Sequence, residues 1–288
     1  MEQFDQIIRL IFQNILLVGL ASIFLLYFLA GKKEELSRNA VLNSSATICV
    51  FAFNMFLIMK YHMALNGWLQ EQYNAIGIPT LPKGTWDAYP LILTSLLGLL
   101  AKDFADYWNH RLMHTKWGWP THAAHHSDTH VNALTTYRVH FLEMFVMSAS
   151  YILLLTWLQM PQAIPFVALC AALHNMYVHL DVDWRHGPVK YLVASPYFHR
   201  WHHADTPEAY GKNLANIVPL WDVMFGTYHD PGKIEAPMGL RESGVNDTNP
   251  VAILFFPFME WGRMLRRKWQ HKGTAPRSTG EPQVHPGE

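Results

Sequence analysis

Three short histidine clusters constrain this chain more than any other feature. They hold eight of its 17 histidines: His110 and His114 in HRLMH, His122, His125 and His126 in HAAHH, and His199, His202 and His203 in HRWHH. Within each cluster, the spacing places the imidazoles on one face of a helix. Neutral imidazole is the commonest side-chain ligand for metal ions, and one structural zinc ion needs only four ligands. The clusters together therefore predict a centre for two metal ions.

Two further histidines, in the sequence HNMYVH, are candidate ligands. His174 and His179 are at i and i+5, a spacing that does not place both on one helical face. The pattern therefore predicts that only one of them is a metal ligand. His174 is the stronger candidate, because the amide of the adjacent Asn175 could orient a ligand or a bound water. Both histidines enter the candidate ligand set.

Two carboxylates precede the first cluster on the same predicted helical face. Asp103 and Asp106 lie at i and i+3, with His110 and His114 at i+7 and i+11. A carboxylate beside a metal-binding histidine usually accepts the other ring N–H and fixes the tautomer. We expect this supporting role for Asp103 and Asp106, and a similar one for Asn175 and His140. The alternative is that either aspartate binds the metal directly.

The chain is strongly apolar. Half of its residues are hydrophobic and 15% are charged, against about 25% in typical soluble domains. A helix needs about 20 residues to cross a bilayer. Long apolar runs occupy residues 7–30, 40–61, 89–101, 141–160 and 162–178. They predict an all-α integral membrane bundle of four to five transmembrane helices; the alternative is a large soluble core of buried helices.

Charge and cysteine content exclude several classes of function. Lys+Arg and Asp+Glu balance at 22 each, so no net positive field favours a nucleic-acid partner. Cys49 and Cys170 lie in separate apolar runs and cannot form a cysteine-rich metal site. Basic residues favour the cytoplasmic side of a membrane. They gather after the first run, within the histidine-rich segment and near residues 263–268, which predicts a multi-pass protein with its metal site on the cytoplasmic face.

These patterns divide the chain into five segments. Residues 1–101 are expected to hold transmembrane helices and an interfacial loop, and residues 102–140 the first histidine-rich metal segment. A transmembrane hairpin is expected over 141–178, and the second histidine-rich segment over 179–232. Residues 233–288 are expected to form an interfacial and disordered C-terminal tail, because the sequence becomes rich in Pro, Gly and Ser from residue 273 onward.

The order HRxxH, HxxHH and HxxHH resembles the fatty acid hydroxylase/sterol desaturase superfamily. The resemblance covers residues 103–228 and includes DYWNHRLMH, THAAHHSDTHVN, YRVHFLE, SPYFHRWHH and KNLANIVPLWDVMFGT. The family usually has proline after the histidine of its RxHPxE element, where this chain has Phe141. The combined pattern is highly specific, whereas a single HxxHH is a weak signal.

The resemblance implies transmembrane helices capped by a cytosolic helical metal domain, and two iron ions that activate O2 to hydroxylate or desaturate a lipid C–H bond. Sterols, fatty acyl chains and related lipids are the implied substrates. Carried over by position, the metal ligands would be the eight clustered histidines, with His174 completing the set. An unactivated C–H bond offers side chains no acid, base or electrophile to exploit, so the metal would carry the difficult step.

Hydroxylation also requires two electrons from outside the centre. The chain has no GxGxxG nucleotide fingerprint, no ferredoxin-type cysteines and no haem domain. A separate electron-transfer partner is therefore expected, a reductase with a ferredoxin or a cytochrome b5-like carrier. Two other functions stay open: a zinc-dependent membrane metallohydrolase, for which the HExxH motif is missing, and a non-catalytic metal-binding membrane protein.

Overall fold

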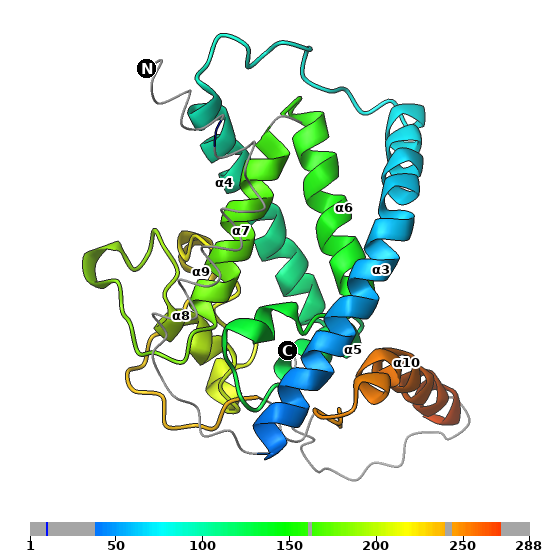
Figure 1. The fold of residues 1–288 in the computed structure, drawn as a ribbon, viewed down its shortest axis with the longest axis vertical. Helices are drawn as coiled ribbons and strands as arrows, with labels where there is room; N and C mark the ends of the chain where they lie inside the picture. Colours follow the sequence, from blue (N-terminus) through cyan, green and yellow to red (C-terminus); the bar gives the residue numbers. More distant parts are fainter. Residues whose placement is uncertain (1–9, 11–37, 161–162, 240–243, 272–288) are drawn as a thin grey trace.

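The computed structural model describes residue 10 and residues 38–160, 163–239 and 244–271 (Figure 1). Four long helices form its main body: α3 (Arg38–Ala75), α4 (Leu91–Met113), α6 (Phe141–Trp157) and α7 (Ile164–Val178). Helix α4 packs against both α6 and α7, and α3 packs along α6. Within the described ranges there is no β-strand, only an isolated bridge between Ala204 and Met238. The expectation of a helical fold is confirmed.

Short elements gather at one end of the long helices. They are α5 (Trp119–His126), η1 (Ala133–Tyr137), η3 (Gly187–Val189), α8 (Pro196–His202), η4 (Pro207–Ala209) and α9 (Leu220–Phe225). Local sequence defines their ends. The side chain of Ser195 accepts a hydrogen bond from the backbone N–H of Phe198 and caps α8, whose first residue is Pro196. Gly226 ends α9 in the left-handed conformation, with φ of 76°.

The prediction of four to five transmembrane helices is wrong for the described part of the chain. Among its helices, none is both long and apolar enough to cross a membrane. Helices α6 and α7 are apolar but have 17 and 15 residues, against the roughly 20 that a bilayer requires. Helix α4 has 23 residues, but Lys102, Asp103 and Asp106 occupy its second half. Apart from Leu10, the first predicted span at 7–30 lies outside the described residues.

The C-terminal segment also differs from its prediction. Within the expected tail of residues 233–288, helix α10 covers Pro250–His271 and packs on α5 and α3 (Figure 1). Residues 272–288, where disorder was expected, lie outside the described residues. The other segment boundaries stay predictions.

A buried arginine joins the long helices to the short elements. Arg138 has no exposed surface. Its guanidinium donates to the side-chain oxygen of Asn43 on α3 at 2.9 Å, to the carbonyl of Ala124 on α5 at 3.0 Å and to the carbonyl of Asp247 at 2.7 Å. The planar guanidinium satisfies acceptors in several directions, which a lysine could not do. Arg138 therefore fixes α5 relative to α3 and the segment before α10.

We expect Arg138→Met to lower the free energy of unfolding by about 3–5 kcal/mol, because it leaves several buried acceptors without a donor. Denaturant unfolding of the purified chain measures the change. Lys233→Met is the matched control, since the Lys233 side chain is 82% exposed, and it should alter the same free energy by less than about 0.5 kcal/mol. Equal stability of Arg138→Met and the parent chain would contradict the role given to the guanidinium.

Candidate metal centre

Nine histidines from four helices converge at one end of the bundle. Helix α4 contributes His110 and its C-cap, His114, and α5 contributes His122, His125 and His126. His179 is the C-cap of α7. Helix α8 contributes His199 and His202, and its C-cap is His203. Because the three clusters follow helical spacing, each helix end directs its imidazoles toward the same interior region.

The nine rings divide into two groups, each with its ligand atoms within 4.8 Å of one another. The five-histidine group consists of His110, His114, His122, His126 and His202, and the four-histidine group consists of His125, His179, His199 and His203. The groups adjoin, since the stacked rings of His126 and His203 have centroids 4.6 Å apart. The structure thus separates the histidines into two adjacent places for a metal ion.

The distances between ring nitrogens fit metal coordination. In the four-histidine group, the Nε2 atom of His179 lies 3.2 Å from that of His125 and 3.0 Å from that of His199. In the five-histidine group, the Nε2 atoms of His110 and His122 are 3.0 Å apart. Two nitrogens bound at right angles to one ion, each at about 2.1 Å, would be about 3.0 Å apart. The arrangement suits a shared cation.

Backbone carbonyls orient three of the rings. The Nδ1–H groups of His110, His202 and His179 donate to the carbonyl oxygens of Leu214, Lys212 and Asn175, at 2.7, 2.7 and 2.6 Å respectively. A ring that donates through Nδ1 keeps its lone pair on Nε2. Asn175, expected to act through its amide, thus contributes its backbone oxygen instead.

Several ring nitrogens are buried without a protein partner. Within the described part of the chain, the Nε2 atoms of His114, His126 and His202 are buried and make no hydrogen bond. Buried polar atoms are nearly always satisfied in folded proteins, so unsatisfied atoms that converge indicate a ligand. All three belong to the five-histidine group. The residues present therefore fit a metal ion.

Burial also keeps the imidazoles in the protonation state that metals require. Desolvation lowers the pKa of His110 and of His179 to about 4. The pKa values of the other seven histidines lie well below the usual range for the same reason, with repulsion from neighbouring imidazoles adding to the shift. At neutral pH the rings are therefore uncharged and able to bind a cation.

Glu143 on α6 is a site residue that the sequence did not single out. Its Oε1 atom accepts the Nδ1–H of His122 at 2.8 Å, and Glu143 is 5% exposed. Burial raises the pKa of the Glu143 carboxyl well above its usual range. A nearby metal cation would favour the carboxylate and reverse that shift. The sequence feature that could have identified Glu143 as a site residue is its position in the YRVHFLE motif.

The two aspartates support the centre from farther away than expected. The carboxylate of Asp103 accepts backbone N–H groups from Ile217 at 2.8 Å and Val218 at 2.9 Å. Asp106 pairs with Lys102, one turn away on α4. Neither aspartate is hydrogen-bonded to a histidine of the centre. Asp103 instead fixes the loop that follows Leu214, whose carbonyl orients His110.

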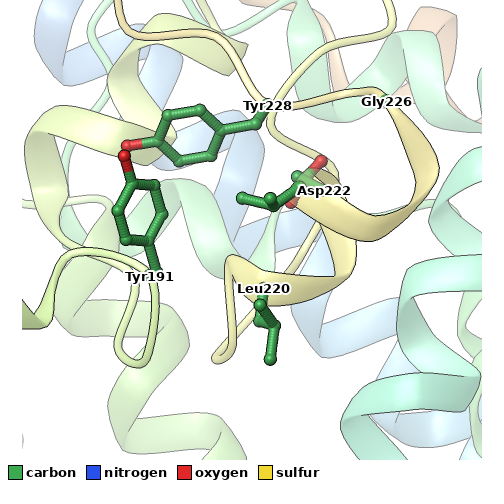
Figure 2. Close-up of a pocket in the computed structure, with 6 residues that line it drawn as sticks. Tyr191, Leu220, Asp222, Gly226 and Tyr228 are labelled. Carbon is green, nitrogen blue, oxygen red and sulfur yellow. The ribbon is translucent and has the colours of Figure 1, made fainter.

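A third carboxylate, Asp222 on α9, holds the same loop. Its oxygens accept the backbone N–H groups of Leu214 at 2.7 Å and Ala215 at 2.8 Å. Asp222 also borders a surface pocket beside α9, where the rings of Tyr191 and Tyr228 point toward each other (Figure 2). None of the nine histidines lines this pocket, so it is separate from the metal centre.

Two predicted histidines lie outside both groups. His140 caps α6, where its Nδ1 accepts the backbone N–H of Leu142, and its Nε2–H donates to the carbonyl of Leu254 at 3.0 Å. His174 lies on α7, five residues before His179, and is in neither group. The α7 backbone therefore presents His179 to the centre, and the structure does not bring His174 to it.

We expect Glu143→Gln to weaken metal binding at the five-histidine group about 10- to 100-fold, because a neutral amide supports His122 less strongly than a carboxylate does. Metal titration of the metal-stripped protein measures the affinity. The exposed Glu71→Gln variant carries the same chemical change away from the site and should bind as the parent does. An unchanged affinity in Glu143→Gln would remove Glu143 from the centre.

Comparison with known proteins agrees with this site. Residues 95–227 match the family model for fatty acid hydroxylases. The chain is 33% identical over 180 residues to ornithine lipid hydroxylase OlsE of Rhizobium tropici, covering 62% of this chain and 54% of that protein. It is 27% identical over 190 residues to alkylglycerol monooxygenase of Homo sapiens, covering 65% of this chain and 40% of that protein.

The matched region spans about half the length of these curated relatives, or less. No solved structure matches the chain. The family match runs from near the start of α4 to just past the end of α9 and so encloses all nine converging histidines. The resemblance carried by HRLMH, HAAHH and HRWHH is confirmed: the region that holds these clusters is similar to the fatty acid hydroxylase family.

Proposed function

We propose that this chain is an O2-dependent oxidoreductase that hydroxylates a C–H bond of a lipid at a centre of two iron ions. The observation that carries the proposal is the convergence of nine uncharged imidazoles, seven of them from buried residues, into two adjacent groups. A single metal ion cannot use nine nitrogen ligands, and a structural ion needs four. The match to the family model for fatty acid hydroxylases and the names of the two relatives support the choice of lipid hydroxylation.

One ion would be held by the five-histidine group and the other by the four-histidine group. A shell of imidazoles suits several divalent transition metals, and the chemistry proposed here selects iron. Bound iron would supply O2 activation and attack on an unactivated C–H bond, which no side chain could provide. The four-histidine group offers fewer donors, so more positions at its ion would be open to O2 or substrate.

The residues of the chain prepare the site for that chemistry. Desolvation keeps the imidazoles uncharged, so no proton has to leave before metal binds. The carbonyls of Leu214, Lys212 and Asn175 hold three rings in fixed orientations. The buried surroundings exclude bulk water, which protects a reactive oxidant from side reactions.

The substrate is proposed to be a lipid with an alkyl or acyl chain. The two relatives are named as an ornithine lipid hydroxylase and an alkylglycerol monooxygenase, and these names differ in the head group of the lipid. The reaction consumes two electrons, and we propose that a separate reductase with a ferredoxin or a cytochrome b5-like carrier supplies them.

Hydroxylation is favoured over desaturation because both relatives are named as oxygen-inserting enzymes.

Replacing one ligand in each group should separate the two metal sites. His202→Ala removes a donor from the five-histidine group and His125→Ala removes one from the four-histidine group. We expect each variant to lose up to one equivalent of iron and to form no product, because a missing ligand breaks the site that contained it. Elemental analysis of purified protein measures the iron content.

His130→Ala provides the control for the ligand variants, because His130 lies in neither group. It should keep the iron content and activity of the parent chain. Full iron content and full activity in either His125→Ala or His202→Ala would contradict the assignment of the ligands.

The function itself is tested by lipid profiling under labelled dioxygen. A host that expresses the chain should accumulate a hydroxylated lipid whose new oxygen carries the label, and the product should be missing when His125→Ala is expressed. A hydroxylated lipid whose oxygen comes from water, or lipid hydrolysis supported by zinc without O2, would refute the proposal. A desaturated lipid without the label would change the reaction from hydroxylation to desaturation.

A further inference from the structure

Helix α10 buries one side against the protein. Ile253 has no exposed surface, Phe256 is almost fully buried, and the helix packs on α5 and α3 (Figure 1). The indole N–H of Trp261 donates to the carbonyl of Trp117 at 3.0 Å. Trp117 lies in the segment between His114 and α5, so α10 is fixed directly beside residues of the metal centre.

The opposite side of α10 is apolar and exposed. Its exposed hydrophobic side chains are Val251, Phe255, Phe258, Met259, Leu265 and Trp269. Their helical spacing places all six on one side of the 22-residue helix, and we call this set the α10 stripe. Trp269 is 78% exposed, the largest exposed fraction among the large hydrophobic residues. A contiguous exposed stripe of this kind marks an interaction surface.

Basic residues accompany the α10 stripe along the last turns of the helix. They are Arg263, Arg266, Arg267 and Lys268. Glu260 is the acidic residue of α10, and it pairs with Arg263 at 2.9 Å and with Arg267 at 3.4 Å. By helical position, Arg266 and Lys268 lie on either side of Leu265 and Trp269, the C-terminal part of the stripe. Long basic side chains can extend from an apolar contact to negative charges above it.

We propose that α10 lies in the plane of an anionic lipid surface, with the α10 stripe in the acyl boundary and the basic residues among the lipid phosphates. An amphipathic helix with one apolar side, aromatic residues and flanking basic residues is suited to this position. The alternative occupant of the stripe is a second copy of the chain. The positive charge beside the stripe favours the lipid, because two copies would bring like charges together.

This position deepens the proposed function, on which its biological meaning rests. Helix α5 carries His122, His125 and His126, and α10 packs directly on α5. A lipid surface in contact with the α10 stripe would then lie about 10 Å, the width of one helix, from α5 and its histidines. Lipid substrate would thus be held close to the metal centre.

The test is sedimentation of the purified full-length chain with vesicles. One set is phosphatidylcholine mixed with phosphatidylglycerol, and the other is phosphatidylcholine alone. The parent chain should bind the anionic vesicles more tightly than the neutral ones. Arg266→Gln with Lys268→Gln should weaken binding to the anionic vesicles about fivefold for each residue. Phe255→Ser with Trp269→Ser should weaken binding to both sets by at least about tenfold.

Matched variants control for charge and for hydrophobicity. Lys83→Gln with Lys233→Gln removes two exposed charges elsewhere, and Ile76→Ser removes a side chain that is 75% exposed in the turn after α3. Both controls should bind as the parent does. Circular dichroism and metal content confirm that each variant is folded, and the charge variants decide the test if the hydrophobic pair does not fold.

The proposal is overturned if the parent chain does not bind anionic vesicles, or if the α10 variants bind them like the parent. A dimer that dissociates in Phe255→Ser with Trp269→Ser, seen by light scattering without vesicles, would assign the stripe to a second copy. Vesicle binding needs neither iron nor O2. A failure of the lipid contact can therefore be distinguished from a failure of the proposed oxygenase activity.

Discussion

The desolvation of nine imidazoles is the constraint on which the rest of the structure depends. Removing the rings from water makes protonation unfavourable, so the interior holds a dense set of neutral nitrogen donors. Protein contacts alone do not satisfy this set, because the Nε2 lone pairs of His110 and His122, whose Nδ1–H groups donate elsewhere, face each other at 3.0 Å. The fold must therefore hold the rings in place until a cation resolves their mutual repulsion.

A surrounding layer of hydrogen bonds provides that restraint. Asp222 and Asp103 fix the loop that presents the Leu214 carbonyl to His110. On the other side, Asn43 of α3 donates to Asp128, which follows α5 closely, and Arg138 donates to α5 itself. The histidine-bearing helix ends are thus held in place by hydrogen bonds from segments that are distant in sequence.

The sequence could predict the histidine groups because their spacing is local. Helical periodicity alone places His122, His125 and His126 on one side of α5. The sequence favoured His174 over His179, whereas the end of α7 brings His179 into the four-histidine group. Glu143 and Asp222 were missed because their partners are distant in sequence. Within the described residues, the interpretation of the apolar runs as spans was wrong. Hydropathy did not show that α6 and α7 have only 17 and 15 residues, or that α4 includes the buried Lys102 and Asp103.

The use of main-chain oxygens as acceptors for His110, His179 and His202 has a consequence for how such a centre can vary. A carbonyl is present whatever the side chain, so positions 175, 212 and 214 can change identity and still orient their histidines. The conformation of those segments is what must persist. Side chains around the centre can therefore change while the imidazoles keep their positions relative to one another.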